Sequence, residues 1–203
     1  MNTVIRPETE ADHAATESLT RDAFWDKYKP GADEHLVLHQ LRRSSAYVPE
    51  LAYVAVADDT VVGHIAYSRA VVRDGTRATT VLCMGPFSVA PTRQHQGIGR
   101  TLLETTIAKA TELGFPAIVI FGDPGYYGKY DFVDAQRHRI QTADGLNFAA
   151  FMVRILSAEA MTGITGRFVA DPAFVVQKAD LDEFERRFPP REKHVLPGQL
   201  HGD

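Results

Sequence analysis

Cysteine is nearly absent from this 203-residue sequence, which contains only Cys83. A single thiol excludes an internal disulfide and any cysteine-based zinc cluster, and it suits a reducing compartment. No apolar stretch approaches the ~20 residues of a membrane helix, and the first ten residues lack the basic and apolar regions of a signal peptide. We therefore expect a cytoplasmic protein without a membrane partner.

A strong excess of either charge is also missing. Lysine and arginine number 22 against 26 aspartate and glutamate residues, which gives a formal net charge of −4, and the basic residues are scattered. Binding to nucleic acid normally requires a concentrated basic surface, so we expect no nucleic-acid partner. With 44% hydrophobic residues, the composition is that of a globular protein.

The length fits a single domain over residues 1–203, with a core over about residues 1–156 and a C-terminal extension over about residues 157–203. Three prolines, Pro189, Pro190 and Pro197, lie in the tail of this extension. We expect this tail to be poorly ordered.

Hydrophobic periodicity predicts the secondary structure. A long predicted helix runs from Ile98 to Leu113 and is followed by Gly114, which suits the left-handed residue that often ends a helix. Strands precede, flank and follow this helix, so we predict an α/β or α+β domain. The predicted helices cover residues 8–24, 33–42, 98–113 and 180–187, and the predicted strands cover 3–6, 51–57, 61–71, 79–89, 117–121 and 148–156.

The most informative stretch is FSVAPTRQHQGIGRTLL, residues 87–103, in which a strand ends, a polar loop turns and a helix begins. Gly97 and Gly99 let the backbone approach a ligand, and the free N–H groups of a helix N-terminus attract phosphate oxygens. A dinucleotide fingerprint would need a small residue in place of Leu102, and a P-loop would need Gly-Lys-Ser/Thr where Arg100 follows Gly99. The alternative to a diphosphate site is a pair of glycines that merely close a turn.

Two motifs resemble the GNAT superfamily of N-acetyltransferases. The sequence QHQGIG at residues 94–99 has the form Q/R-x-x-G-x-G/A of the family's pyrophosphate loop, and it lies between a strand and a long helix as in that family. The stretch GDPGYYGKYDF at residues 122–132 is similar to the family's later "YxxxGF" motif and to the GDPxYY variant of the YhbS-like branch of predicted acetyltransferases. It departs from the family pattern at Asp131, where glycine is usual. Residues 151–153 and 171–174 also resemble that branch.

The resemblance implies a mixed, strongly twisted central sheet whose middle strands splay apart around acetyl-CoA, flanked by helices. It implies an acetyl-CoA-dependent enzyme, with acetyl-CoA as co-substrate, that acetylates a primary amine of a small molecule, peptide or protein. Paired subunits are common in the family, so a homodimer is one expectation. The main chain of Phe87, Ser88 and Val89 would pair with the pantetheine arm, and the amides of Gln94, His95, Gln96, Gly97, Ile98, Gly99, Arg100 and Thr101 would hold the pyrophosphate.

Tyr127 matches the family's usual proton donor to the departing thiolate, because it stands five residues before Phe132. The alternative is an aromatic residue packed under the helix, a role that suits the neighbouring Tyr126 better. Some family members carry a glutamate base at the position of Cys83, which here is more typical of a small buried hydrophobe than of a nucleophile. The general base is left open among Glu34, Glu50, His64 and water.

His35 and His39 stand one helical turn apart, a spacing that suits a metal. The sequence offers no HExxH pattern and no evident third ligand, so we interpret the pair as solvated surface histidines and expect no metal. Two other classes of function remain as alternatives. One is a non-catalytic module that binds or senses acyl-CoA, and the other is an enzyme that uses ATP or NAD.

Overall fold

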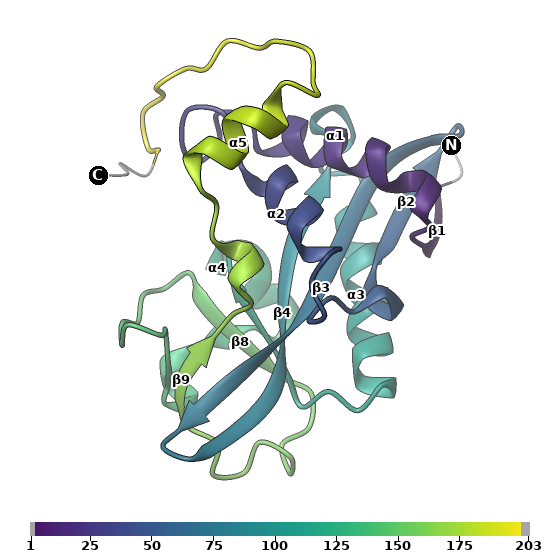
Figure 1. Ribbon diagram of the computed structural model, residues 1–203. Helices are drawn as coiled ribbons and strands as arrows, with labels where there is room; N and C mark the ends of the chain where they lie inside the picture. Colours follow the sequence, from purple (N-terminus) through teal and green to yellow (C-terminus); the bar gives the residue numbers. More distant parts are fainter. Residues whose placement is uncertain (1–2, 200–203) are drawn as a thin grey trace.

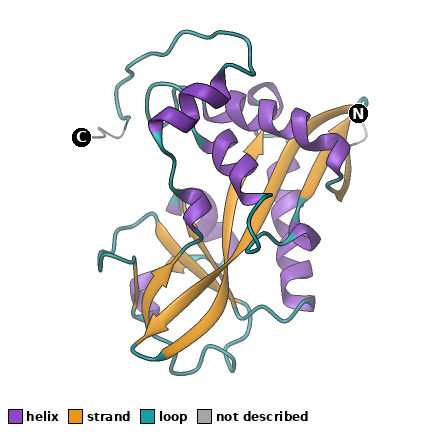
Figure 2. Ribbon diagram, in the orientation of Figure 1, coloured by secondary structure: helices purple, strands orange, loops and turns teal. Residues whose placement is uncertain are grey.

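The computed structural model describes residues 3–199 and contains one nine-stranded, mostly antiparallel sheet with helices on both faces (Figures 1 and 2). The strands follow the order β1-β2-β3-β4-β5-β8-β6, while β9 pairs with β3 and β7 pairs with β9. The strands are β1 (Thr3–Pro7), β2 (Tyr53–Ala57), β3 (Thr60–Asp74), β4 (Arg77–Val89), β5 (Ala117–Phe121), β6 (Val133–Asp134), β7 (Ile140–Gln141), β8 (Phe151–Ile155) and β9 (Gly166–Val169). The helices are α1 (His13–Phe24), α2 (Glu34–Leu41), α3 (Ile98–Glu112), α4 (Pro124–Tyr127) and α5 (Lys178–Glu185).

The long hairpin of β3 and β4 forms the centre of the molecule, with α1 and α2 on one face and α3 on the other (Figure 1). Successive side chains of β3 point alternately toward these two faces. Ile65 packs in the core cluster that contains Leu102 and Leu103 of α3. His64 points the opposite way, toward Glu8, and is fully buried. Helices therefore cover both faces of the β3–β4 hairpin next to the candidate site.

The pairing of β4 with β5 is short. These parallel strands pair only at Leu82 with Ile118 and at Cys83 with Val119. Beyond Cys83, β4 continues along β3 as far as the pair of Val89 with Gly63. The edge of β4 that faces β5 is thus left without a strand partner from Met84 onward within residues 3–199. This confirms the predicted fold class, a mixed sheet whose middle strands splay apart.

Several predicted elements are confirmed at or near their boundaries. The predicted helix after the loop is α3, and the residues that bracket it, Gly97 and Gly114, have φ values of +85° and +79°. Only glycine takes this left-handed conformation without strain, which explains why the helix begins and ends there. The strand predicted at residues 117–121 is β5. Within residues 3–199, no helix is long and apolar enough to cross a membrane.

Within the C-terminal extension, α5 lies beside α1 and α2 (Figure 1). Glu185 of α5 forms a salt bridge with Arg21 at 2.8 Å and lies 2.8 Å from Nε2 of His35. The ring of His35 also contacts Phe184 and Phe188. His35 is completely buried, so the interpretation of a solvated surface histidine is wrong for this residue. The helical pattern alone did not indicate that a distant segment would cover this face.

The tail beyond α5, where the sequence predicts weak order, makes defined contacts with α1 and the loop after it. The indole nitrogen of Trp25 donates to the carbonyl of Glu192 at 2.9 Å. Arg191 pairs with Asp22 at 2.9 Å, and His194 Nδ1 lies 2.9 Å from Asp26. The last four residues of the predicted tail lie outside the described residues.

Candidate cofactor and catalytic site

The loop between β4 and α3 is exposed and carries two residues with left-handed backbone conformation. His95 has a φ of +60° and Gly97 a φ of +85°, so the chain turns sharply twice within three residues. Two glutamine side chains fasten the loop, since Gln94 donates to the carbonyl of Val89 at 3.2 Å and Gln96 donates to the carbonyl of Thr92 at 3.2 Å. Gln94, the first residue of the QHQGIG motif, therefore connects the loop to the end of β4.

The N-terminus of α3 begins at this loop. Gly97 is the N-cap residue and no side chain caps the helix. The N–H groups of the first helical turn, at Ile98, Gly99 and Arg100, have no acceptor within the helix. The side chain of Ile98 is buried in the core, so this residue offers only its backbone to a ligand. These orphan donors and the positive end of the helix dipole suit a diphosphate.

Gly99 lies where the strand, the helix and α4 converge. A β-carbon on this residue would stand 3.0 Å from the hydroxyl of Tyr126 and 3.2 Å from the ring of Phe87. A β-carbon on Gly97 would meet no atom within 4 Å, so space above the loop is open. The two glycines therefore serve different purposes, since Gly99 permits close packing and Gly97 permits the turn.

The candidate pantetheine segment, Phe87 to Val89, lies on the unpaired edge of β4. Phe87 and Val89 both approach Gly99 and face α3. Ser88 faces the other way, is buried, and has its hydroxyl 3.2 Å from Oγ1 of Thr20 in α1. The structure thus brings the predicted strand segment and the predicted loop together at the opening of the sheet.

Tyr127 closes the short helix α4, which begins with an Asp123 cap that accepts from the N–H of Gly125 at 2.8 Å. The ring of Tyr127 packs edge to face on Tyr126 with centroids 4.9 Å apart, and on Phe132 at 5.7 Å. Burial, helped by the neighbouring phenol of Tyr126, raises the pKa of Tyr127 well above its usual range. The hydroxyl therefore keeps its proton at neutral pH, as a donor must.

Asp131, the departure from the family pattern, keeps the turn that glycine would make. Its φ is +59°, in the left-handed region that aspartate tolerates better than most residues. Arg154 holds the turn, because it bonds to the carbonyl of Tyr130 and lies 3.5 Å from the Asp131 carboxylate. Phe132 is then buried in the core behind Tyr127.

The four titratable candidates for a base or nucleophile differ in their surroundings. Glu50 is exposed, and burial raises the pKa of Glu34 at the start of α2. Burial raises the pKa of the Cys83 thiol to about 12, which keeps the sulfur protonated and weakly nucleophilic. His64 is buried beside Glu8. Residues 3–199 contain no group of three or more His, Cys, Asp or Glu side chains that could hold a metal ion.

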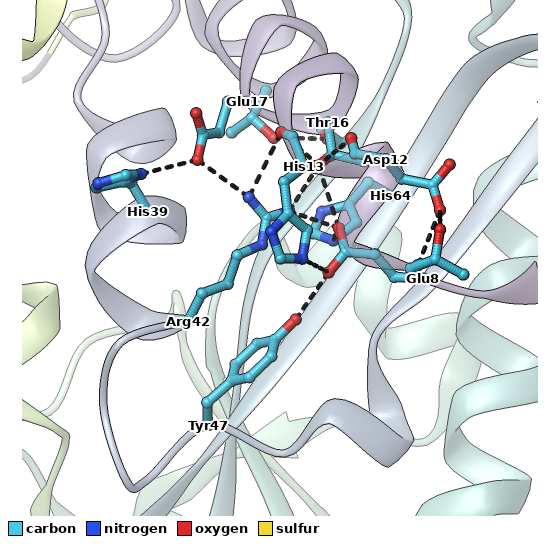
Figure 3. Close-up of polar contacts among 12 residues, drawn as sticks. Glu8, Asp12, His13, Thr16, Glu17, His39, Arg42, Tyr47 and His64 are labelled. Carbon is cyan, nitrogen blue, oxygen red and sulfur yellow. Dashed lines mark hydrogen bonds and ion pairs between the residues drawn. The ribbon is translucent and has the colours of Figure 1, made fainter.

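One polar cluster, centred on Glu8, is not predicted by the sequence pattern (Figure 3). The predicted first helix began at Glu8, where a surface position is expected. In the structure a 3-10 turn (Glu10–Asp12) precedes α1, and the Glu8 side chain turns inward with an exposed fraction of 3%. A signal was present, because Thr9 and Asp12 form a capping box that starts the helical segment after Glu8.

The unpaired edge of β4 opens beside the uncapped, glycine-bearing start of α3, and this arrangement suits a ligand that carries a diphosphate, as coenzyme A does. A family model described as the acetyltransferase (GNAT) family matches residues 15–125. The chain therefore belongs to the GNAT family of acetyltransferases, and it is an enzyme of the N-acetyltransferase class.

Relatives in sequence and structure agree with this assignment. YhbS of Escherichia coli K12, described as an uncharacterized N-acetyltransferase, is 29% identical over 164 residues, which cover 80% of this chain and 93% of YhbS. The crystal structure of E. coli YhbS in complex with CoA matches with a TM-score of 0.76 at 27% identity, over 86% of this chain and 92% of that chain. A Brucella melitensis GNAT acetyltransferase in complex with acetyl-CoA matches with a TM-score of 0.69 at 27% identity, over 86% and 99% of the two chains.

Proposed function

We propose that the protein transfers the acetyl group of acetyl-CoA to a primary amine of a small-molecule, peptide or protein acceptor. The observation that carries this proposal is the unpaired edge of β4 at Phe87 to Val89, which leads directly to the free N–H groups at the start of α3. Two similar proteins were crystallised with CoA or acetyl-CoA, which supports the same cofactor here.

In this proposal the main chain of Phe87, Ser88 and Val89 pairs with the pantetheine arm, and the amides from Gln94 to Thr101 hold the pyrophosphate. An N–H group of the β4 edge polarises the thioester carbonyl, as an oxyanion hole does. The amine nitrogen attacks the carbonyl carbon, so that a C–N bond forms while the C–S bond breaks. Tyr127 donates its hydroxyl proton to the departing sulfur.

We also propose that the enzyme is cytoplasmic and acts without a nucleic-acid or membrane partner. The support is the single cysteine and the scattered basic residues of the sequence. A homodimer is proposed on the resemblance to the family alone, and light scattering of the purified protein would test it.

Acetyl-CoA or CoA is expected to raise the melting temperature of the protein, because a ligand that binds only the folded state stabilises it by mass action. At a hundredfold excess over the dissociation constant the gain is about 2.7 kcal/mol. ATP and NAD at matched concentrations should shift the melting temperature much less. Equal shifts from all these ligands would remove the case for a coenzyme A site, and thiol release with a panel of amines separates an enzyme from a module that only binds acyl-CoA.

Gly97→Val is expected to raise the dissociation constant of CoA at least about tenfold, or ~1.4 kcal/mol. The valine side chain would enter the open space above the loop that the pyrophosphate needs. Because the φ of Gly97 is +85°, any side chain also strains the backbone. Calorimetric titration with CoA measures the affinity of the folded variant.

Gly114→Val is the matched control for this strain. Gly114 lies at the other end of α3, has a φ of +79° and would place a β-carbon in open space. Both variants should therefore lose similar stability, and only Gly97→Val should lose affinity. If the two variants bind CoA equally well, the loop is only a turn.

A further inference from the structure

Glu8 lies at the centre of a buried cluster that joins the end of β1 to α1, α2 and β3 (Figure 3). Its carboxylate accepts hydrogen bonds from Arg42, from the hydroxyl of Tyr47 at 2.9 Å and from Oγ1 of Thr16 at 3.1 Å. Burial alone would raise the pKa of Glu8, but its contacts with His64 and Arg42 outweigh burial and lower the pKa to about 2. Glu8 is therefore a carboxylate at neutral pH, and Arg42 already balances its charge.

His64 approaches the same carboxylate from β3 and is completely buried. Its Nε2 lies 3.1 Å from Oε1 of Glu8 but forms no hydrogen bond with it. Its Nδ1 has no hydrogen-bond partner among residues 3–199. Burial lowers the pKa of His64, against the opposing effect of Glu8, so the ring is neutral at neutral pH. A carboxylate only accepts, which favours the tautomer with the proton on Nε2 and a bare lone pair on Nδ1.

The position of His64 connects this cluster to the candidate reaction centre. His64 pairs across the hairpin with Ser88 of β4. Side chains directly opposite each other in an antiparallel pair have β-carbons about 4.5–5.5 Å apart on the same face of the sheet. Ser88 belongs to the segment on the unpaired edge of β4, so the imidazole is one strand away from the opening in which the thioester would lie.

A purely structural role explains Glu8 but not His64. The carboxylate has Arg42, Tyr47 and Thr16 as donors without the imidazole. A buried ring nitrogen without a partner costs free energy that an apolar residue at this position would avoid. A neutral imidazole with a free lone pair beside a carboxylate is instead the arrangement of a general base and its orienting group.

We propose that His64 accepts the proton of the attacking amine, through one bridging water, and that Glu8 is the positioning residue that orients it. The proposal rests on the acetyl transfer proposed above. As the C–N bond forms and the C–S bond breaks, the amine proton passes to Nδ1 of His64 and the hydroxyl proton of Tyr127 passes to the sulfur. The products are the amide and the free thiol, after which His64 releases its proton to solvent and Tyr127 regains one.

The test compares pH–rate profiles of three full-length variants. His64→Asn keeps a polar group near the position of Nδ1 but has no basic nitrogen, so kcat should fall about 10²-fold. The decline of kcat/KM at low pH (the acidic limb of the pH profile), which protonation of His64 causes in the wild type, should disappear. The KM for acetyl-CoA should stay within about twofold, because CoA contacts are untouched. A titration of CoA into the variant by calorimetry confirms that it is folded.

Glu8→Gln and Tyr47→Phe separate positioning from packing. In Glu8→Gln the loss of the carboxylate lowers the pKa of His64 further. The acidic limb of the pH profile should therefore move to lower pH, and the maximum value of kcat/KM should fall. The other charged groups packed around the pair, His13 and Glu17 on α1 and Arg42 at the C-terminal cap of α2, stay in place. Tyr47→Phe removes one hydrogen bond to Glu8 and should leave both the acidic limb and the maximum value of kcat/KM close to wild type.

Two outcomes would overturn the proposal. One is a folded His64→Asn variant, or His64→Gln if the asparagine variant does not fold, that keeps the wild-type kcat and acidic limb. The other comes from ¹⁵N NMR of the imidazole in the wild-type protein, which should show an unprotonated Nδ1 at neutral pH, and a protonated Nδ1 would contradict the base. If the protein binds acetyl-CoA but acetylates no amine, the proposed function is wrong. The NMR measurement would still show whether Nδ1 of His64 is protonated.

Discussion

Tyr127→Phe should lower the turnover of acetyl-CoA about 10²–10⁴-fold, the usual contribution of general acid catalysis. The substitution removes the hydroxyl proton and keeps the ring that packs on Tyr126 and Phe132. The affinity for CoA should change little, since the loop at Gly97 is not touched. Steady-state thiol release gives kcat, and calorimetry with CoA gives the affinity.

Tyr126→Phe is the control for this experiment. The Tyr126 hydroxyl points at Gly99 in the first turn of α3, so its loss should be mild for turnover. If Tyr126→Phe is the damaging change and Tyr127→Phe is silent, the donor is assigned to the wrong tyrosine. A loss below about tenfold in Tyr127→Phe would mean that water protonates the thiolate, because a thiolate is a tolerable leaving group.

The elements around the candidate cofactor site could be predicted because their signals are local. The apolar face of α3 repeats with the helical period, and Gly97 and Gly114 mark its ends by their left-handed backbones. The strand β5 is a continuous apolar run between Pro116 and Gly122, and its predicted boundaries agree with the structure. Such patterns need no knowledge of distant contacts.

The parts that sequence reasoning missed depend on contacts between distant segments. The strand β9 has only four residues and becomes a strand by pairing with the far end of β3, at Val71 to Arg73. The burial of His35 comes from α5, about 150 residues further along the chain. Glu8 and His64 meet because β1 and β3 both pair with β2. Neither hydrophobic period nor turn chemistry reports such pairings.

Gly122 is the second position at which a small change should have a large effect. It directly follows β5, and its N–H donates to the carbonyl of Ala150 at 2.8 Å. Its φ is not in the left-handed region, so alanine fits the backbone. A β-carbon here would stand 2.2 Å from the ring of Tyr127, far inside van der Waals contact. Gly122→Ala must therefore displace this ring. A misplacement of ~1 Å in a catalytic group can cost about 10² in rate, so we expect kcat to fall about 10²-fold.

Gly128→Ala is the matched control, because Gly128 follows Tyr127 directly, has a φ of −58° and would place a β-carbon in open space. This variant should keep its turnover, while both variants should bind CoA as the wild type does. The double variant Gly122→Ala with Tyr127→Phe decides the cause. If Gly122→Ala acts by moving the Tyr127 hydroxyl, adding Tyr127→Phe should cost little more, since the two changes remove one interaction. If the loss of kcat in the double variant equals the product of the two single losses, Gly122→Ala damages the opening between β4 and β5 independently of Tyr127.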